Sequence, residues 1–148
     1  MAMFLGRFHH TMDAKGRVSL PARYRDDLAK SPLVIVEGDE NCLWLYRYED
    51  FEKMTAGLQE SDLDETLNSL RYEFISTAEY VDIDGNGRIR VSADLRDYAG
   101  LSKSVTLTGT GTRLELWDSE AFEARRKGNN KKVLLKELSE RRKSQSSS

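Results

Sequence analysis

Polar and apolar side chains alternate in two short stretches of the chain, over residues 17–20 and residues 88–91. This period of two is typical of a β-strand with one buried face. In each stretch an arginine comes first and is expected to face outward. The side chains expected to face inward are Val18, Leu20, Ile89 and Val91.

A short helix is predicted after each alternating stretch, and two further strands after each helix. Pro21 can occupy the first position of the first helix, while Ser92 is placed to cap the second helix and Gly100 to end it. Gly38 and Gly109 mark hairpins between the later strands. These strands are predicted over 33–36 and 42–46 in the first part, and over 105–108 and 114–117 in the second.

The two parts are copies of one another. Residues 13–53 align without a gap with residues 84–124, and 14 of the 41 positions are identical. A unit of about 40 residues is near the size at which one hydrophobic core no longer stabilises a fold alone. We therefore expect the copies to build one core together. The predicted organisation is a first repeat over 7–51, linking helices over 52–77, a second repeat over 78–122, and a basic C-terminal helix with a disordered tail over 123–148.

The segment between the repeats, residues 49–78, is predicted to be helical. Asp62 and Glu65 have the spacing of a helix N-cap and the third residue after it. Apolar residues at helical spacing form one stripe, which is expected to pack against this chain or a neighbour. The stripe consists of Leu63, Leu67, Leu70 and Phe74.

The C-terminal part is strongly basic although the whole chain is slightly acidic. The formal net charge is −2, but residues 124–148 hold nine Lys and Arg against two Glu. We predict one or two helices over 119–143, interrupted at Gly128–Asn130, and a disordered end over Ser144–Ser148. This basic stretch could contact phosphate, contact RNA or keep the C-terminus soluble, and phosphate contact is slightly favoured.

Composition narrows the class of protein. A hydrophobic content of 39% with 32% charged residues is ordinary for a soluble globular protein. No apolar run approaches the roughly 18 residues of a membrane span, and the apolar N-terminal stretch is too short for a secretory signal. A single cysteine, Cys42, excludes an internal disulfide and suits a reducing compartment. We expect a cytoplasmic protein.

An aspartate followed four residues later by an arginine is the most informative motif, and both repeats contain it. Asp13 and Arg17 flank Ala-Lys-Gly, and Asp84 and Arg88 flank Gly-Asn-Gly, where glycine supplies the positive φ of a hairpin turn. Each pair could lie close enough to form an ion pair. For one copy alone, the simpler interpretation is an Asp that accepts hydrogen bonds from turn amides and a solvated Arg. The presence of two copies in register favours a functional role for the motif over a purely structural one.

These turns carry side chains suited to DNA recognition. A β-ribbon with outward arginines can enter the major groove, where Arg can donate two hydrogen bonds to guanine O6 and N7. An Asp beside the Arg would fix its rotamer and lower the entropy cost of base recognition. Lys15 adds positive charge to the first turn, and strand alternation adds Arg90 as an outward residue. Its counterpart in the first repeat is Ser19, so the two copies need not contact DNA equivalently.

Other chemistries have less support. Residues from Asp82 onward match the first eight positions of a calcium-binding EF-hand loop, but the twelfth position, which requires a bidentate Glu, is Ala93. His9 and His10 lack a Cys or carboxylate cluster at ligand spacing. No catalytic triad or carboxylate dyad stands out. We expect no metal, no cofactor and no enzymatic activity.

The motifs described so far resemble those of a known family. Segments 12–25 and 84–101 are similar to the two halves of the MraZ family, bacterial transcriptional regulators of the AbrB-like superfamily. The resemblance runs from about Phe4 to Phe122 and does not include the basic tail after Lys127. The doubled Asp-x-x-x-Arg at this separation is specific, whereas a single copy would not be.

The resemblance implies a fold, an assembly and a target. The fold is α+β and mainly β, a pseudo-two-fold swapped-hairpin β-barrel built from two tandem repeats, with linking and C-terminal helices. The assembly is a ring-shaped homo-oligomer associated with the nucleoid. Its target is double-stranded DNA, as short direct repeats in the promoter of the division and cell wall gene cluster, where it represses that cluster and its own gene. The residues implied to bind DNA are Asp13, Lys15, Arg17, Asp84 and Arg88, to which strand alternation adds Arg90.

An alternative function stays open from the sequence. The chain could be an oligomeric protein-interaction module that restrains a partner enzyme, with DNA binding incidental. In either case we expect neither a membrane nor a small molecule as partner.

Overall fold

The computed structural model describes residues 3–146, and within this range eight strands and the helices between them follow the order that the two repeats predict. The strands are β1 (Arg7–Thr11), β2 (Arg17–Ser19), β3 (Leu33–Glu37), β4 (Leu43–Arg47), β5 (Glu79–Val81), β6 (Arg88–Arg90), β7 (Ser104–Gly109) and β8 (Leu114–Asp118). The helices are η1 (Ala22–Tyr24), α1 (Arg25–Leu28), α2 (Tyr48–Thr55), η2 (Ala56–Gln59), α3 (Glu65–Leu70), η3 (Arg71–Ile75), α4 (Ala93–Ala99), α5 (Ser119–Lys127) and α6 (Lys131–Ser146).

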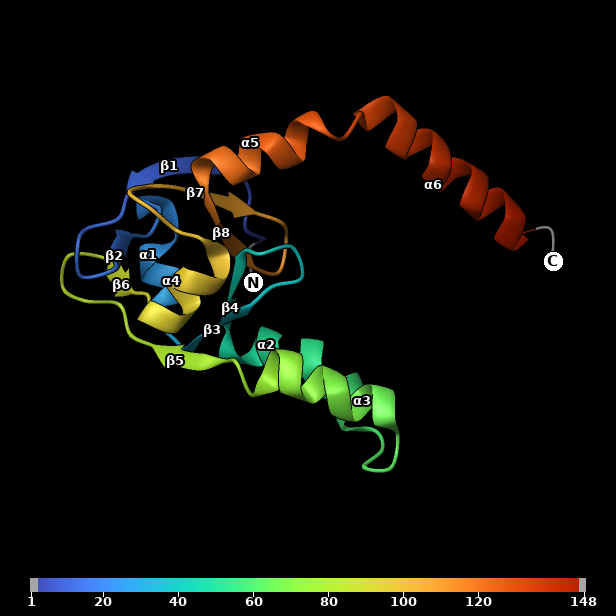
Figure 1. Ribbon diagram of the computed structural model, residues 1–148, viewed down its shortest axis with the longest axis horizontal. Helices are drawn as coiled ribbons and strands as arrows, with labels where there is room; N and C mark the ends of the chain where they lie inside the picture. The colour runs from blue at the N-terminus through green and yellow to red at the C-terminus, as the bar shows by residue number, and fades with distance from the viewer. Residues whose placement is uncertain (1–2, 147–148) are drawn as a thin grey trace.

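The first strand of each repeat pairs with the third strand of the other repeat. β1 pairs with β7 and β5 pairs with β3, which gives a six-stranded antiparallel sheet in the order β1-β7-β8-β4-β3-β5. The second strands pair with each other in a separate antiparallel ribbon, β2–β6, which lies at the left in Figure 1. Each repeat therefore needs the other to complete its strand pairing.

These pairings establish an α+β fold with antiparallel sheets. Among residues 3–146, β1 and β5 are the two edges of the larger sheet, and the ribbon forms a sheet of its own. The closure of these sheets into a swapped-hairpin barrel therefore stays a prediction.

Both faces of the six-stranded sheet are buried. In β3, Leu33 and Ile35 point to one face and Val34 and Val36 to the other. The first face packs against the β2–β6 ribbon, α1 and α4. The second face lies under α2 and α5. The four ribbon side chains predicted to face inward are at most 1% exposed: Val18, Leu20, Ile89 and Val91.

The predicted boundaries of the short helices are largely confirmed. The Ser92 hydroxyl accepts a hydrogen bond from the Leu95 amide at 3.4 Å at the start of α4, and Gly100 follows the helix with a φ of 59°. In the first repeat, Pro21 precedes η1 as its N-cap instead of being its first residue.

The linking segment is not one continuous helix. α2 and η2 are followed by an irregular stretch, and α3 continues into the π-helical turn η3. The N-cap of α3 is Asp64, whose carboxylate accepts a hydrogen bond from the Leu67 amide at 3.0 Å. The prediction of Asp62 as the cap was therefore wrong by two residues, because a second aspartate lies closer to the helix. Leu63 precedes α3 and is 95% exposed, so it does not belong to the predicted apolar stripe.

The C-terminal helices divide where the sequence predicted. α5 and α6 are separated at Gly128–Asn130, and α6 extends away from the body of the protein (Figure 1). The prediction of a disordered end was wrong for Ser144–Ser146, which continue α6, since nothing in these polar residues breaks a helix already formed. Ser147 and Ser148 lie outside the described residues. No helix within residues 3–146 is both long and apolar enough to cross a membrane.

The exchanged pairing predicts that neither repeat folds as a monomer. A fragment of residues 3–77 retains β1 and β3 but loses their partners β7 and β5. We expect it to be unfolded at low concentration and to fold only with residues 78–146 or by pairing with a second copy of itself. Circular dichroism melts over a concentration series, with sedimentation, provide the measurement. A cooperative melt from a monomeric fragment would contradict the interlocked core.

Candidate nucleic-acid interface

Each Asp-x-x-x-Arg segment forms a tight turn that its aspartate closes. The Asp13 amide donates a hydrogen bond to the Arg17 carbonyl at 3.0 Å, and the Gly16 amide donates to the Asp13 carbonyl at 3.0 Å. Oδ1 of Asp13 accepts hydrogen bonds from the amides of Lys15 (3.0 Å) and Arg17 (2.9 Å). The second turn has the same pattern at the equivalent positions, Asp84, Asn86, Gly87 and Arg88.

The other carboxylate oxygen orients the arginine. Oδ2 of Asp13 accepts from Nε of Arg17 at 2.7 Å, and Oδ2 of Asp84 accepts from Nε of Arg88 at 3.1 Å. The side chains of the two arginines are 34% and 27% exposed. The terminal nitrogens of Arg17 make no hydrogen bond to any of residues 3–146, so they remain available to donate to a ligand. One aspartate thus both stabilises the turn and positions the arginine.

Hydrogen bonding also keeps both aspartates ionised. The amide of Arg17 is the largest cause that lowers the pKa of Asp13, to about 2, with smaller contributions from the Arg17 side chain and the Lys15 amide. The amide of Arg88 likewise lowers the pKa of Asp84. A carboxylate that accepts several hydrogen bonds is stabilised in its charged form. At neutral pH both carboxylates are therefore acceptors and both arginines are held.

The strands of the ribbon end on the turn of the opposite repeat. The Leu20 amide donates to the Gly87 carbonyl at 2.9 Å, and the Val91 amide donates to the Gly16 carbonyl at 2.8 Å. These two hydrogen bonds continue the β2–β6 ladder beyond the strands. Each turn is consequently fixed by both repeats.

The ribbon brings the two motifs into contact. Arg17 lies opposite Arg90, and Ser19 lies opposite Arg88. Nη1 of Arg88 is 3.9 Å from Oδ2 of Asp13, so the first aspartate forms ion pairs with the arginines of both repeats. The structure therefore gathers the predicted arginines on one short ribbon.

The remaining predicted residues, Lys15 and Arg90, meet at the first turn. Nε of Arg90 donates to the Lys15 carbonyl at 3.1 Å, which ties the second repeat to this turn. Ser19, at the equivalent position of the first repeat, is too short to make the same contact with the second turn. Lys15 itself is exposed and forms no ion pair with residues 3–146. The six predicted residues thus occupy one continuous surface, and their two turns are not equivalent.

Two arginines next to the turns were not among the predicted site residues. Arg25 of the first repeat packs against Gly87, and its Nε donates to the Leu20 carbonyl at 2.9 Å. Arg96 of the second repeat packs against Gly16. Each turn is therefore supported by an arginine of the opposite repeat. The signal was present in the sequence, because the two arginines are identical positions of the repeat alignment.

Comparison with known proteins places this duplication in a family. The family described as "MraZ protein, putative antitoxin-like" matches residues 3–70 and again residues 74–142. A "Transcriptional regulator MraZ" from Thermoanaerobacter sp. is 35% identical over 139 residues, which are 93% of this chain and 95% of that protein. Proteins of the same name from Saccharopolyspora erythraea and Acetivibrio thermocellus are 39% and 36% identical over 123 residues, 82% of this chain and 85% of each relative.

The chain belongs to the MraZ family. The family pattern matches twice in succession, which agrees with the duplication seen in the sequence and in the strand order. The relatives are named as regulators, and membership of the MraZ family supports a chain without enzymatic activity.

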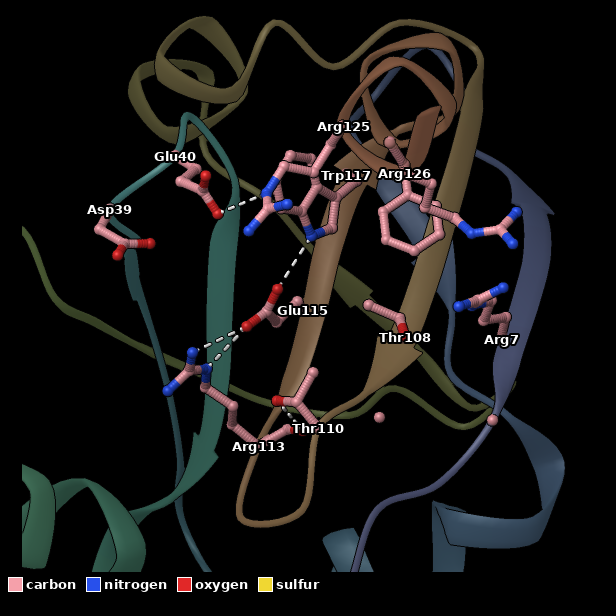
Figure 2. Close-up of a pocket in the computed structure, with 13 residues that line it drawn as sticks. Arg7, Asp39, Glu40, Thr108, Thr110, Arg113, Glu115, Trp117, Arg125 and Arg126 are labelled. Carbon is pink, nitrogen blue, oxygen red and sulfur yellow. Dashed lines mark hydrogen bonds and ion pairs between the residues drawn. The ribbon is translucent and has the colours of Figure 1, made fainter. Parts of the chain in front are cut away.

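One hollow of this MraZ-family chain lies away from the ribbon. Figure 2 shows it between α5 and the strands β7 and β8, with a volume of about 620 Å³. Glu115, which is 8% exposed, accepts hydrogen bonds from Arg113 at 2.9 Å and from Trp117 at 3.0 Å, and Arg125 pairs with Glu40 at 2.8 Å. These charged groups form hydrogen bonds and ion pairs with one another. We therefore interpret the residues around the hollow as a structural network that stabilises the fold.

Several residues with catalytic or metal-binding chemistry have structural surroundings in the described range, residues 3–146. Burial raises the pKa of the Cys42 thiol to about 12, so it stays protonated at neutral pH. Within residues 3–146, no group of three or more His, Cys, Asp or Glu is placed to hold a metal ion. Both oxygens of Asp84, a candidate calcium ligand, accept hydrogen bonds from its own turn.

The second turn has two glycines that differ sharply in their tolerance of a side chain. Gly87 has a φ of +74°, and an added Cβ would lie 2.5 Å from Nε of Arg25, whereas a Cβ at Gly85 would meet open space. Left-handed backbone costs a residue with a Cβ about 1–2 kcal/mol. We expect Gly87→Ala to lower the free energy of unfolding by at least about 1–2 kcal/mol. Denaturant melts provide the measurement, and Gly85→Ala in the same turn is the matched control. Equal stability of the two variants would contradict the described turn.

The lowered pKa of Asp13 predicts how stability changes with pH. The pKa is about 2 when folded against an ordinary value of 3.8, so its ionisation stabilises the fold fully above pH 4, and this contribution is lost as the pH falls through 2. We expect the melting temperature of Asp13→Asn to fall less steeply than that of the wild type between about pH 4 and pH 2. The amide keeps an acceptor oxygen for the turn but cannot titrate. Thermal melts provide the measurement. An equally steep fall of the melting temperature with pH in both proteins would contradict the lowered pKa of Asp13.

Proposed function

We propose that this chain is a sequence-specific DNA-binding transcriptional regulator that recognises base edges with the β2–β6 ribbon. The observation that supports this most directly is the pair of adjacent turns in which Asp13 and Asp84 orient Arg17 and Arg88. Its relatives are named transcriptional regulators, which supports the same function.

The ribbon has the size and the donors needed for the major groove. A two-stranded ribbon fits into that groove, and an arginine donating two hydrogen bonds to guanine is the commonest specific contact there. An arginine already held by an aspartate loses less rotamer freedom on binding. Lys15 and Arg90, which are exposed on the same surface, would contact phosphates or further bases.

Because one ribbon is small, tight binding to DNA would require several copies of the chain. A few arginines bind weakly, but linked copies that engage spaced repeats gain affinity through effective concentration. We therefore propose a ring-shaped homo-oligomer in which the ribbon closes a swapped-hairpin barrel. The proposed target is a set of short direct repeats in the promoter of the division and cell wall gene cluster, which the protein would repress together with its own gene. The MraZ resemblance supports this target.

The site assignment is tested by removing the arginines one at a time. We expect Arg17→Ala and Arg88→Ala each to weaken binding to a duplex of the promoter region by about 5- to 150-fold, because one bidentate contact to guanine is worth about 1–3 kcal/mol. Binding to a scrambled duplex should change less. A gel shift or fluorescence anisotropy titration at fixed salt measures both.

Arg7→Ala is the matched control. This arginine is exposed, begins β1 and lines the hollow shown in Figure 2, away from the ribbon. It should leave DNA binding unchanged. Wild-type affinity in both ribbon variants would disprove the site, and binding to a protein partner in nuclease-treated lysate with no binding to DNA would favour the protein-interaction alternative.

A further inference from the structure

The linking helices are incompletely covered in the isolated chain. None of residues 56–77 is buried, although the segment contains apolar side chains. Phe74 stacks on Trp44 with ring centroids 5.5 Å apart and attaches the segment to the body. Beyond that contact, Tyr72 is 71% exposed and Leu63 is 95% exposed. Leu63 lies in the stretch before α3 and Tyr72 lies on η3, and exposed apolar side chains of this kind can contribute to an interaction surface.

The same helices carry a strong negative charge. Residues 56–77 hold five Asp and Glu against one basic residue, Arg71. Glu65 and Glu73 lie on α3 and η3, both are exposed, and neither forms an ion pair with residues 3–146. The acidic side chains from the end of η2 to η3 are Glu60, Asp62, Asp64, Glu65 and Glu73.

α6 has the complementary properties. Every one of its described residues is exposed. Its six basic side chains form no ion pair with residues 3–146. Lys132, Lys136 and Lys143 share one face at helical spacing, and Leu135 and Leu138 form the stripe beside it. The basic residues are Lys131, Lys132, Lys136, Arg141, Arg142 and Lys143.

We propose that α6 of one copy docks on the linking helices of a neighbouring copy. The two surfaces carry opposite charges, and each surface has exposed leucine or tyrosine side chains that a contact would bury. Within one chain, α6 and α3 extend from different parts of the body, α6 from the top and α3 from the bottom in the view of Figure 1. The contact is therefore head to tail, and repeated contacts of this type close into a ring when the rotation allows.

This inference rests on the self-association in the proposed function and identifies the surfaces responsible. The leucines decide between partners, because phosphate would match the lysines but leave the apolar stripe exposed to water. A membrane fits less well as the partner of α6. An interfacial helix needs a broad apolar face, usually with aromatic residues, and α6 contains no aromatic residue. Both docking surfaces lie on the opposite side of the body from β2–β6 (Figure 1), so assembly leaves the ribbons free for DNA.

The test reverses the charge of each surface separately and then mixes the variants. One variant is Lys132→Glu/Lys136→Glu, and the other is Glu65→Lys/Glu73→Lys. All four positions are exposed, and circular dichroism melts verify folding. The matched control for the lysine reversal is Lys30→Glu/Lys103→Glu, which lowers the net charge by the same amount at exposed positions outside both surfaces. Sedimentation velocity without DNA, over a concentration series at low and high salt, measures assembly.

Each reversed variant alone should require at least about tenfold more protein to assemble, and the control should match the wild type. An equimolar mixture of the two variants should assemble like the wild type, because every junction then joins opposite charges. The neutral variants Lys132→Gln/Lys136→Gln and Glu65→Gln/Glu73→Gln should show a smaller loss in the same direction.

Several results would overturn the docking. They are a monomeric wild type, wild-type assembly in the reversed variants, or no recovery on mixing. Unchanged assembly together with weaker duplex binding by Lys132→Glu/Lys136→Glu would assign α6 to DNA. None of these results would affect the ribbon, which the Arg17→Ala titration tests independently.

Discussion

The structure depends on the hydrogen-bond exchange in which each repeat completes the strands of the other. The amides of Leu20 and Val91 donate to carbonyls in the turns of the opposite repeat, and the outer strands β1 and β5 pair across the same boundary. Because neither repeat has a complete set of strand partners of its own, both repeats together stabilise the buried core and the exposed turns. The geometry of the candidate interface is therefore coupled to the stability of the whole fold.

Within that frame, the turn aspartates link local structure to function. One oxygen of a single carboxylate accepts hydrogen bonds from two backbone amides, and the other oxygen accepts one from an arginine Nε. The turn would keep much of its shape with any acceptor in this position, but only a charged acceptor also holds a guanidinium firmly. One aspartate side chain thus accepts the hydrogen bonds of its turn and also holds an arginine, and DNA recognition by that arginine is the proposed function.

The parts of the structure that follow from local pattern could be predicted from the sequence. Strand alternation correctly placed Val18 and Ile89 inside, because one residue of register decides which face a side chain occupies. Contacts between distant segments could not be predicted in this way, and so the support of the turns by Arg25 and Arg96 was missed. The linking helices were predicted poorly. Asp62 and Asp64 are almost equivalent as N-caps in the sequence, and few contacts with the body fix where the helix begins.

The difference between Ser19 and Arg90 gives the ribbon a polarity. A perfect two-fold ribbon would bind a duplex equally well in either orientation and would favour inverted half-sites. Here Arg90 donates a hydrogen bond to the first turn, and Ser19 at the equivalent position is too short to reach the second, while Asp13 pairs with both Arg17 and Arg88. A duplex therefore meets a different surface from each end. Copies of this chain bound along DNA would therefore all have the same orientation, which fits direct repeats of a half-site and not inverted ones.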